Sequence, residues 1–139
     1  MTAKEYLRQI RRLDEVINVK LEQLDELRSM AERVTSAPPT LDRVQPGGGD
    51  QDKLGTVVAK IVDLSSTLAD SEDELLSMRQ HALELIKRIP DSRHKTVLYD
   101  YYFNRKTWEQ IAVDMGFTYQ WVRRLHGRAL QEFEKLWES

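Results

Sequence analysis

Three arginines near the C-terminal end of the chain lie in a segment without acidic residues. Residues 116–131 read GFTYQWVRRLHGRALQ and contain Arg123, Arg124 and Arg128. An arginine side chain can donate two hydrogen bonds to guanine, and a glutamine such as Gln120 pairs in a similar way with adenine. These residue types suit hydrogen bonding to base edges or phosphates, provided that one helix holds them on its exposed face.

A helix that begins after Thr118 would hold these side chains in that way. Thr118 is a favourable N-cap residue, and a buried stripe follows it: Val122, Leu125, Ala129 and Phe133. At roughly 100° per residue, the opposite face of the helix carries Tyr119, Gln120, Arg123, Arg124 and Gly127. The free N–H groups at Thr118 and the first turn would attract a phosphate. Arg128, like Arg105 and Lys106, either reaches a phosphate or stays a solvated surface cation. Gly127 either lets a partner approach the backbone or packs tightly on the rest of the protein.

A second, shorter helix precedes the arginine-rich one. Thr107 and Gln110 form a capping-box pattern at its start, and Gly116 suits a sharp turn at its end. The spacing of Ala112, Gly116 and Val122 is typical of a helix-turn-helix, in which a small residue lies where the two helices cross. We therefore expect Ala112 and Val122 to lie together. Upstream, Asp91 is the expected N-cap of a further helix of about 12 residues.

Residues 1–89 predict two long helices joined by a linker at 36–52, which contains Pro38, Pro39 and three glycines. Apolar residues recur every seven positions in the second helix: Leu54, Ile61, Leu68, Leu75, Ala82, Ile89 and Val57, Leu64, Met78, Leu85, with Ser71 as the one polar residue. The first helix has a similar stripe, interrupted by Lys20 and widened by Leu7 and Leu21. The pattern predicts an antiparallel coiled-coil hairpin. Its stripes are wider than one partner helix covers, so two hairpins are expected to pair.

Composition excludes several classes of function. The chain has 139 residues, no cysteine and a formal net charge of −2, so it has neither a disulfide framework nor the strongly basic character of a bulk nucleic-acid binder. The three histidines, His81, His94 and His126, lack metal-ligand spacing, and no glycine-rich phosphate loop is present. We expect no catalytic residue, metal or cofactor. With no signal-peptide pattern and no membrane-spanning run, a cytoplasmic location is expected.

The C-terminal residues resemble a known family. Residues 93–137, RHKTVLYDYYFNRKTWEQIAVDMGFTYQWVRRLHGRALQEFEKLW, are similar to the helix-turn-helix of sigma-70 region 4. The layout as a whole, with a coiled-coil arm before that domain, resembles small phage-encoded transcriptional regulators of the RinA and ArpU kind. The resemblance implies that Tyr119, Gln120, Arg123 and Arg124 face the bases. No segment resembles the other promoter-binding helices of sigma factors.

These observations predict an all-α protein with a helical hairpin at 1–89 and a small helix-turn-helix domain at 90–139. The expected function is sequence-specific binding of double-stranded DNA in transcription regulation, either as an oligomer formed through residues 1–89 or together with RNA polymerase. The DNA-binding residues are expected to be Thr118, Tyr119, Gln120, Arg123, Arg124 and Arg128. Two alternatives stay open: a coiled-coil scaffold, and a DNA-packaging subunit resembling a small terminase.

Overall fold

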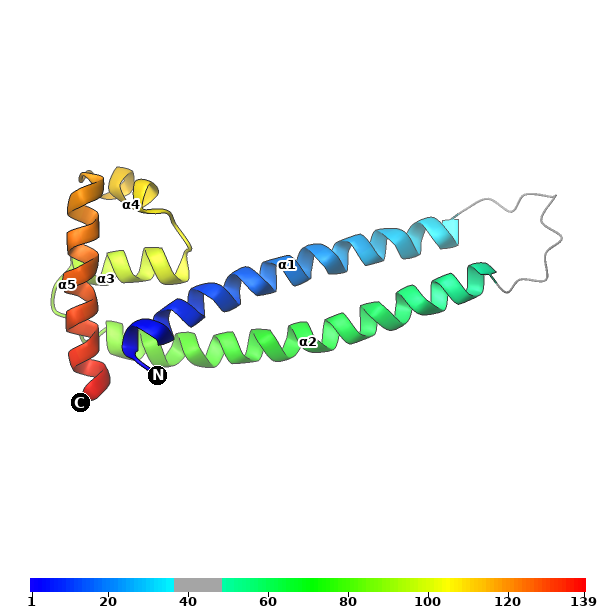
Figure 1. The fold of residues 1–139 in the computed structure, drawn as a ribbon, viewed down its shortest axis with the longest axis horizontal. Helices are drawn as coiled ribbons and strands as arrows, with labels where there is room; N and C mark the ends of the chain where they lie inside the picture. The colour runs from blue at the N-terminus through cyan, green and yellow to red at the C-terminus, as the bar shows by residue number, and fades with distance from the viewer. Residues whose placement is uncertain (37–48) are drawn as a thin grey trace. The chain divides into compact units, whose positions relative to one another are not determined.

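A computed structural model describes residues 1–36 and 49–139, and all regular structure in these residues is helical (Figure 1). The elements are α1 (Ala3–Ser36), α2 (Gly49–Ile86), α3 (Ser92–Leu98), the π-helical turn η1 (Tyr99–Phe103), α4 (Trp108–Met115) and α5 (Tyr119–Glu138). The predicted all-α class is confirmed. Most of the expected linker lies outside the described residues, but Ser36 and residues 49–52 belong to the helices rather than to a linker.

The described residues divide into two compact units. One unit consists of residues 16–73, and the other consists of residues 1–15 together with 74–139. The second unit takes in more of the chain than residues 90–139, because the first turns of α1 and the last turns of α2 pack with the C-terminal helices.

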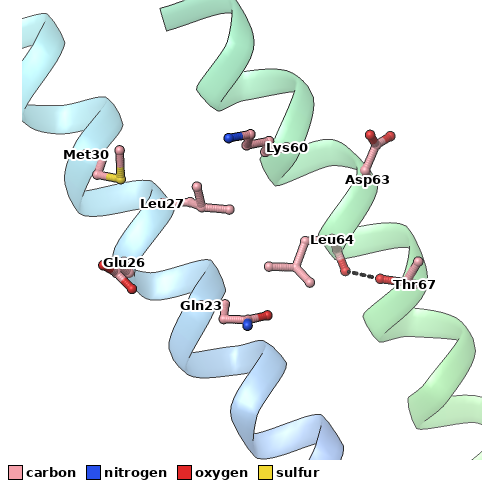
Figure 2. Close-up of a pocket in the computed structure, with 8 residues that line it drawn as sticks. All are labelled: Gln23, Glu26, Leu27, Met30, Lys60, Asp63, Leu64 and Thr67. Carbon is pink, nitrogen blue, oxygen red and sulfur yellow. Dashed lines mark hydrogen bonds between the residues drawn. The ribbon is translucent and has the colours of Figure 1, made fainter. Parts of the chain in front are cut away.

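Within the unit of residues 16–73, α1 and α2 lie side by side and run in opposite directions. Leu27 and Leu64 point toward each other between the two helices in Figure 2, in a groove that also includes Met30 and Thr67. The expected apolar stripes face inward: buried in this unit are Ile17, Leu24, Val57 and Leu68. Leu21 departs from the expectation, since 39% of it is exposed.

The two polar interruptions of the apolar stripes pair with each other. The Lys20 ammonium donates a hydrogen bond to the Ser71 hydroxyl over 2.9 Å, and both residues are partly buried. Burying a polar group between paired helices costs free energy unless the group has a hydrogen-bond partner, and the partner is available at only one alignment of the helices. This contact therefore favours the observed register of α1 against α2.

In the other unit, the first turns of α1 are held by aromatic and ionic contacts. Tyr6 donates a hydrogen bond to the Met78 carbonyl over 3.2 Å. The Asp14 carboxylate lies 2.9 Å from Arg105 and 3.4 Å from Arg79. The fully buried side chains of this unit include Leu7, Ile10, Ile89, Leu98, Tyr102 and Phe133. Residues from both ends of the described chain thus share one core.

The helix that opens the C-terminal part forms as expected. The Asp91 carboxylate accepts a hydrogen bond from the Arg93 backbone N–H over 2.8 Å, and hydrogen bonds from Arg93 lower the pKa of this carboxyl. α3 and η1 together cover residues 92–103, in agreement with the predicted length. The last turn is wider than an α-helical turn, because the Asn104 N–H donates to the Tyr99 carbonyl.

Candidate nucleic-acid interface

The turn between α4 and α5 is fixed by capping groups at three positions. Thr107 and Gln110 form a complete capping box at the start of α4. Gly116 ends α4 in the left-handed region, with φ of 71°, a conformation that glycine adopts without steric cost. The Thr118 hydroxyl then accepts a hydrogen bond from the Trp121 N–H over 3.1 Å and begins α5. Short-range interactions therefore determine where both helices start and how the chain turns between them.

A small apolar cluster holds the two helices together. Its buried members are Val97, Ile111, Ala112, Val122 and Leu125, which come from α3, α4 and α5. The expected meeting of Ala112 and Val122 in one core is confirmed. Partly buried side chains close the edge of this cluster: Tyr101, Trp108, Met115, Phe117 and Trp121. Trp108 and Trp121 both contribute to packing in this way.

α5 has two clearly different faces. The predicted inward residues are all buried, with Val122, Ala129 and Phe133 at 0% exposure and Leu125 at 1%. The residues predicted to face a partner are exposed: Tyr119, Gln120, Arg123, Arg124 and Gly127. Thr118 and Arg128, the other two candidates for DNA contact, are exposed as well. One helix thus presents all of the candidate side chains to solvent.

Arg123 is oriented by aromatic rings. Its guanidinium donates a hydrogen bond to the Tyr119 hydroxyl over 3.0 Å and lies 5.4 Å from the centre of the Trp108 ring. Trp108 is in turn stacked on Tyr101, with ring centres 3.9 Å apart and planes at 9°. Interactions with aromatic faces restrict a guanidinium without neutralising its charge. Arg123 therefore stays cationic in a restricted position on the exposed face.

The other candidate side chains differ in how they are held. Arg128 lies 5.4 Å from the centre of the Trp121 ring. Among the described residues, Arg124 and Gln120 have no partner for a hydrogen bond or an ion pair. Their donors and acceptors are satisfied by water and can exchange it for base edges or phosphate oxygens.

Two further cations of the sequence are engaged within the protein. Arg105 pairs with Asp14, as described above. The Lys106 ammonium lies 2.8 Å from the Asp114 carboxylate, and this hydrogen bond is the main reason why the pKa of Lys106 is raised. Of the two roles left open for them, phosphate contact or a surface cation, the structure shows them paired with acids.

His126 is a partly buried member of the site that sequence reasoning did not identify. Its Nε2 atom lies 2.8 Å from the Tyr102 hydroxyl, and its ring meets the Trp108 ring edge-on at 4.6 Å. Burial, together with the positive charges of Lys4, Arg123 and Arg8, lowers the pKa of His126 to about 4. Burial also raises the pKa of Tyr102. The position of His126, four residues after Val122 and seven before Phe133, was a signal for this burial.

Gly127 lies in open space. A β-carbon at this position would meet no atom within 4 Å, so tight packing against the rest of the protein does not explain the glycine. The described backbone leaves this point of α5 accessible to a partner.

The arrangement suits recognition of a partner. In the described part of the chain no group of three or more histidine, cysteine or acidic residues could hold a metal ion. No helix there is long and apolar enough to cross a membrane. What the geometry provides is a capped helix with two exposed arginines, a glutamine and a tyrosine in its first two turns, supported from behind by an apolar core.

Comparison with known proteins agrees with this geometry. Residues 91–133 match the model of the family described as Sigma-70, region 4, which is a family of DNA-binding domains and not of enzymes. The match covers less than half of the chain. Neither curated proteins nor solved structures gave a significant match. The family match and the geometry of α4 and α5 together indicate a DNA-binding helix-turn-helix of the sigma-70 region 4 type in this part of the chain.

Proposed function

We propose that the protein is a sequence-specific transcriptional regulator, phage-encoded and of the RinA and ArpU kind, that inserts α5 into the major groove of promoter DNA. The observation that carries the proposal is the exposed face of α5, which is free of acidic residues from 116 to 131 and belongs to a helix-turn-helix of sigma-70 region 4 type. The proposal places the protein in the cytoplasm, with its DNA.

The candidate DNA-contacting residues of α5 have different roles in this proposal. Arg124 and Gln120 read base edges, because their polar groups have no partner among the described residues. Arg123 and Tyr119 act as a hydrogen-bonded pair at the same surface. Thr118 and the first N–H groups of α5, with Arg128, bind phosphates.

The functional division into residues 90–139, which read DNA, and residues 1–89, which associate, is part of the proposal. The unit of residues 16–73 exposes aliphatic side chains, among them Val19 at 52%, Val58 at 45% and Val62 at 61%. Exposed aliphatic groups on both helices favour association with a second copy of the chain or with RNA polymerase. Either form of association increases the effective affinity of a small DNA-reading unit.

The proposal is tested by selecting bound fragments from random double-stranded DNA with the full-length protein. We expect enrichment of one sequence motif, and we expect Arg124→Ala to bind the selected site more weakly while Lys87→Ala binds it like the parent. Lys87 is a suitable control because it is an exposed cation that directly follows α2 and pairs with Glu84. Absence of any enriched motif would contradict sequence-specific binding.

A DNA-packaging subunit is the second candidate, favoured by the combination of a DNA-binding helix-turn-helix with exposed aliphatic groups on the long helices. Electron microscopy of the purified full-length protein distinguishes it from the regulator. Closed rings of many subunits support packaging, whereas dimers or other small assemblies support the regulator.

A further inference from the structure

The first turns of α1 are fixed beside the helices that form the candidate DNA interface. The rings of Tyr6 and Trp137 lie 4.8 Å apart, which joins α1 to the C-terminal half of α5. The Arg11 guanidinium lies 4.1 Å from the centre of the Tyr101 ring and also donates hydrogen bonds to the Tyr101 and Lys106 carbonyls. All of these residues belong to one compact unit. The N-terminal turns of α1 are therefore part of the same rigid surroundings as α5.

A stack of aromatic rings connects α1 to the exposed face of α5. Arg11 covers Tyr101, Tyr101 is stacked on Trp108, and the guanidinium of Arg123 lies over Trp108. Two rings thus separate a cation of α1 from a cation of the recognition helix. Each contact holds the next one in place, so the distance between the two helices is determined by packed side chains.

Lys4 and Arg8 lie on the same side of α1 as Arg11, since residues four and seven positions apart share one face of a helix. Both side chains are exposed, and among the described residues neither takes part in an ion pair. The neighbouring acids are engaged elsewhere: Glu5 accepts a hydrogen bond from the Thr2 N–H, and Glu15 pairs with Arg11. The positive charges of Lys4 and Arg8 are therefore not neutralised by the protein.

Lys4 and Arg8 are also close to Arg123 in electrostatic terms. The three cations act on the same partly buried ring, that of His126, and each of them lowers its pKa. Charges of one sign that gather on one side of a unit raise its free energy in water and create an attractive potential for a polyanion. The partner that such a surface fits is the phosphate backbone of DNA.

We propose that Lys4 and Arg8 bind phosphate oxygens of the DNA that α5 reads, so that the DNA interface consists of α5 and the first two turns of α1. This inference rests on the proposed function and adds to it a second helix, outside the matched residues 91–133. Helix-turn-helix units read bases with one helix and contact the backbone with neighbouring elements. Contacts of Lys4 and Arg8 position the protein and do not depend on base sequence.

The test compares Lys4→Gln/Arg8→Gln with the parent and with Arg28→Gln/Arg33→Gln in the full chain. The control removes the same charge from exposed positions on the same helix, but in the other compact unit. Binding is measured by fluorescence anisotropy over a range of salt concentrations, on the selected site and on a scrambled duplex. Circular dichroism checks that each variant keeps the helix content of the parent.

We expect the first double variant to reduce the slope of log K against log salt by about 1.8, since each phosphate contact contributes about 0.9. Its affinity for both duplexes should fall by the same factor, up to about 60-fold at about 0.1 M salt, so that the preference for the selected site is unchanged. The charge-conserving swap Lys4→Arg/Arg8→Lys should bind like the parent, and so should the control.

Three outcomes overturn the inference. In the first outcome, the parent binds DNA and Arg124→Ala weakens that binding, but the salt slope of Lys4→Gln/Arg8→Gln equals that of the parent. This result removes the role of α1 and leaves the proposed function intact. In the second outcome, the control double variant loses as much DNA affinity as Lys4→Gln/Arg8→Gln, which means that the effect comes from the total charge of the protein and not from these two positions. If the parent binds neither duplex, the proposed function fails together with the inference.

Discussion

The contact between buried Tyr102 and partly buried His126 predicts how the stability of the C-terminal unit depends on pH. In the folded protein, burial and three nearby cations lower the pKa of His126 to about 4, against an ordinary value of 6.5. In the unfolded chain the imidazole regains its ordinary pKa. Between these two values the unfolded state binds a proton that the folded state does not bind. The contribution of the neutral His126 ring to the unfolding free energy is therefore fully present above about pH 6.5 and is lost as the pH falls toward 4.

The size of the effect follows from the two pKa values. At 1.36 kcal/mol for each pKa unit, the interval between 6.5 and about 4 corresponds to about 3 kcal/mol of unfolding free energy. Of the groups around the ring, Lys4, Arg8 and Arg123 repel the imidazolium, and the Tyr102 hydroxyl keeps its hydrogen bond with the neutral ring. A loss of about 3 kcal/mol is a large part of the stability of a small protein.

The assay is urea unfolding of the full chain at pH 7.5 and at pH 4.5, followed by circular dichroism. The parent is compared with His126→Gln, which keeps a polar partner for Tyr102 but does not titrate, and with the exposed control His81→Gln. Between pH 7.5 and pH 4.5, we expect the unfolding free energy of His126→Gln to fall by about 2–3 kcal/mol less than that of the parent, and that of His81→Gln to fall as much as that of the parent. An equal loss in parent and His126→Gln refutes the reasoning, as does a midpoint above 6 for the His126 ring in an NMR titration.

Four other predictions concern the interface and the core. Arg123→Ala and Arg124→Ala should each lose about 1–3 kcal/mol of binding to the selected site with unchanged melting temperature, measured by anisotropy and circular dichroism; parent-like binding by both removes α5 as the reader. Ala112→Leu should overpack the buried contact with Val122 and cost about 1–3 kcal/mol in urea unfolding, while a stable variant would show that the cluster has spare room. Gly127→Ala should stabilise α5 by up to about 1 kcal/mol, because its β-carbon meets nothing within 4 Å; a less stable variant would contradict this. Multi-angle light scattering should find the full chain oligomeric at micromolar concentration, and a monomer would argue against association through residues 1–89.

Short-range signals explain why much of the fold could be predicted. Asp91, Thr107 and Thr118 each cap a helix through a hydrogen bond to a backbone group two or three residues away, so the sequence around each cap is sufficient. The buried stripe of α5 follows from helical periodicity alone. For the same reason the exposed face, with Arg123 and Arg124, could be identified before the structure was known.

Contacts between distant residues could not be predicted in this way. Along α1, Arg11 lies three residues before Asp14, and only the folded chain shows that Asp14 meets Arg79 and Arg105. Helical periodicity also does not show how far an apolar stripe extends around a helix, which is why Leu21 was expected to be buried although 39% of it is exposed. The pairing of Lys20 with Ser71 required the register of the two helices, which neither helix contains by itself.

The shared core of the N-terminal turns and α5 has a consequence for synthesis on the ribosome. Tyr6 packs against Trp137, and Arg11 against Tyr101, so native contacts of this unit join residues that leave the ribosome early to residues that leave it much later. α1 therefore emerges long before its partners and keeps Leu7 and Ile10 exposed during that interval. The unit therefore completes its core in a late closing step, and a nascent chain that lacks α5 also lacks the candidate DNA interface.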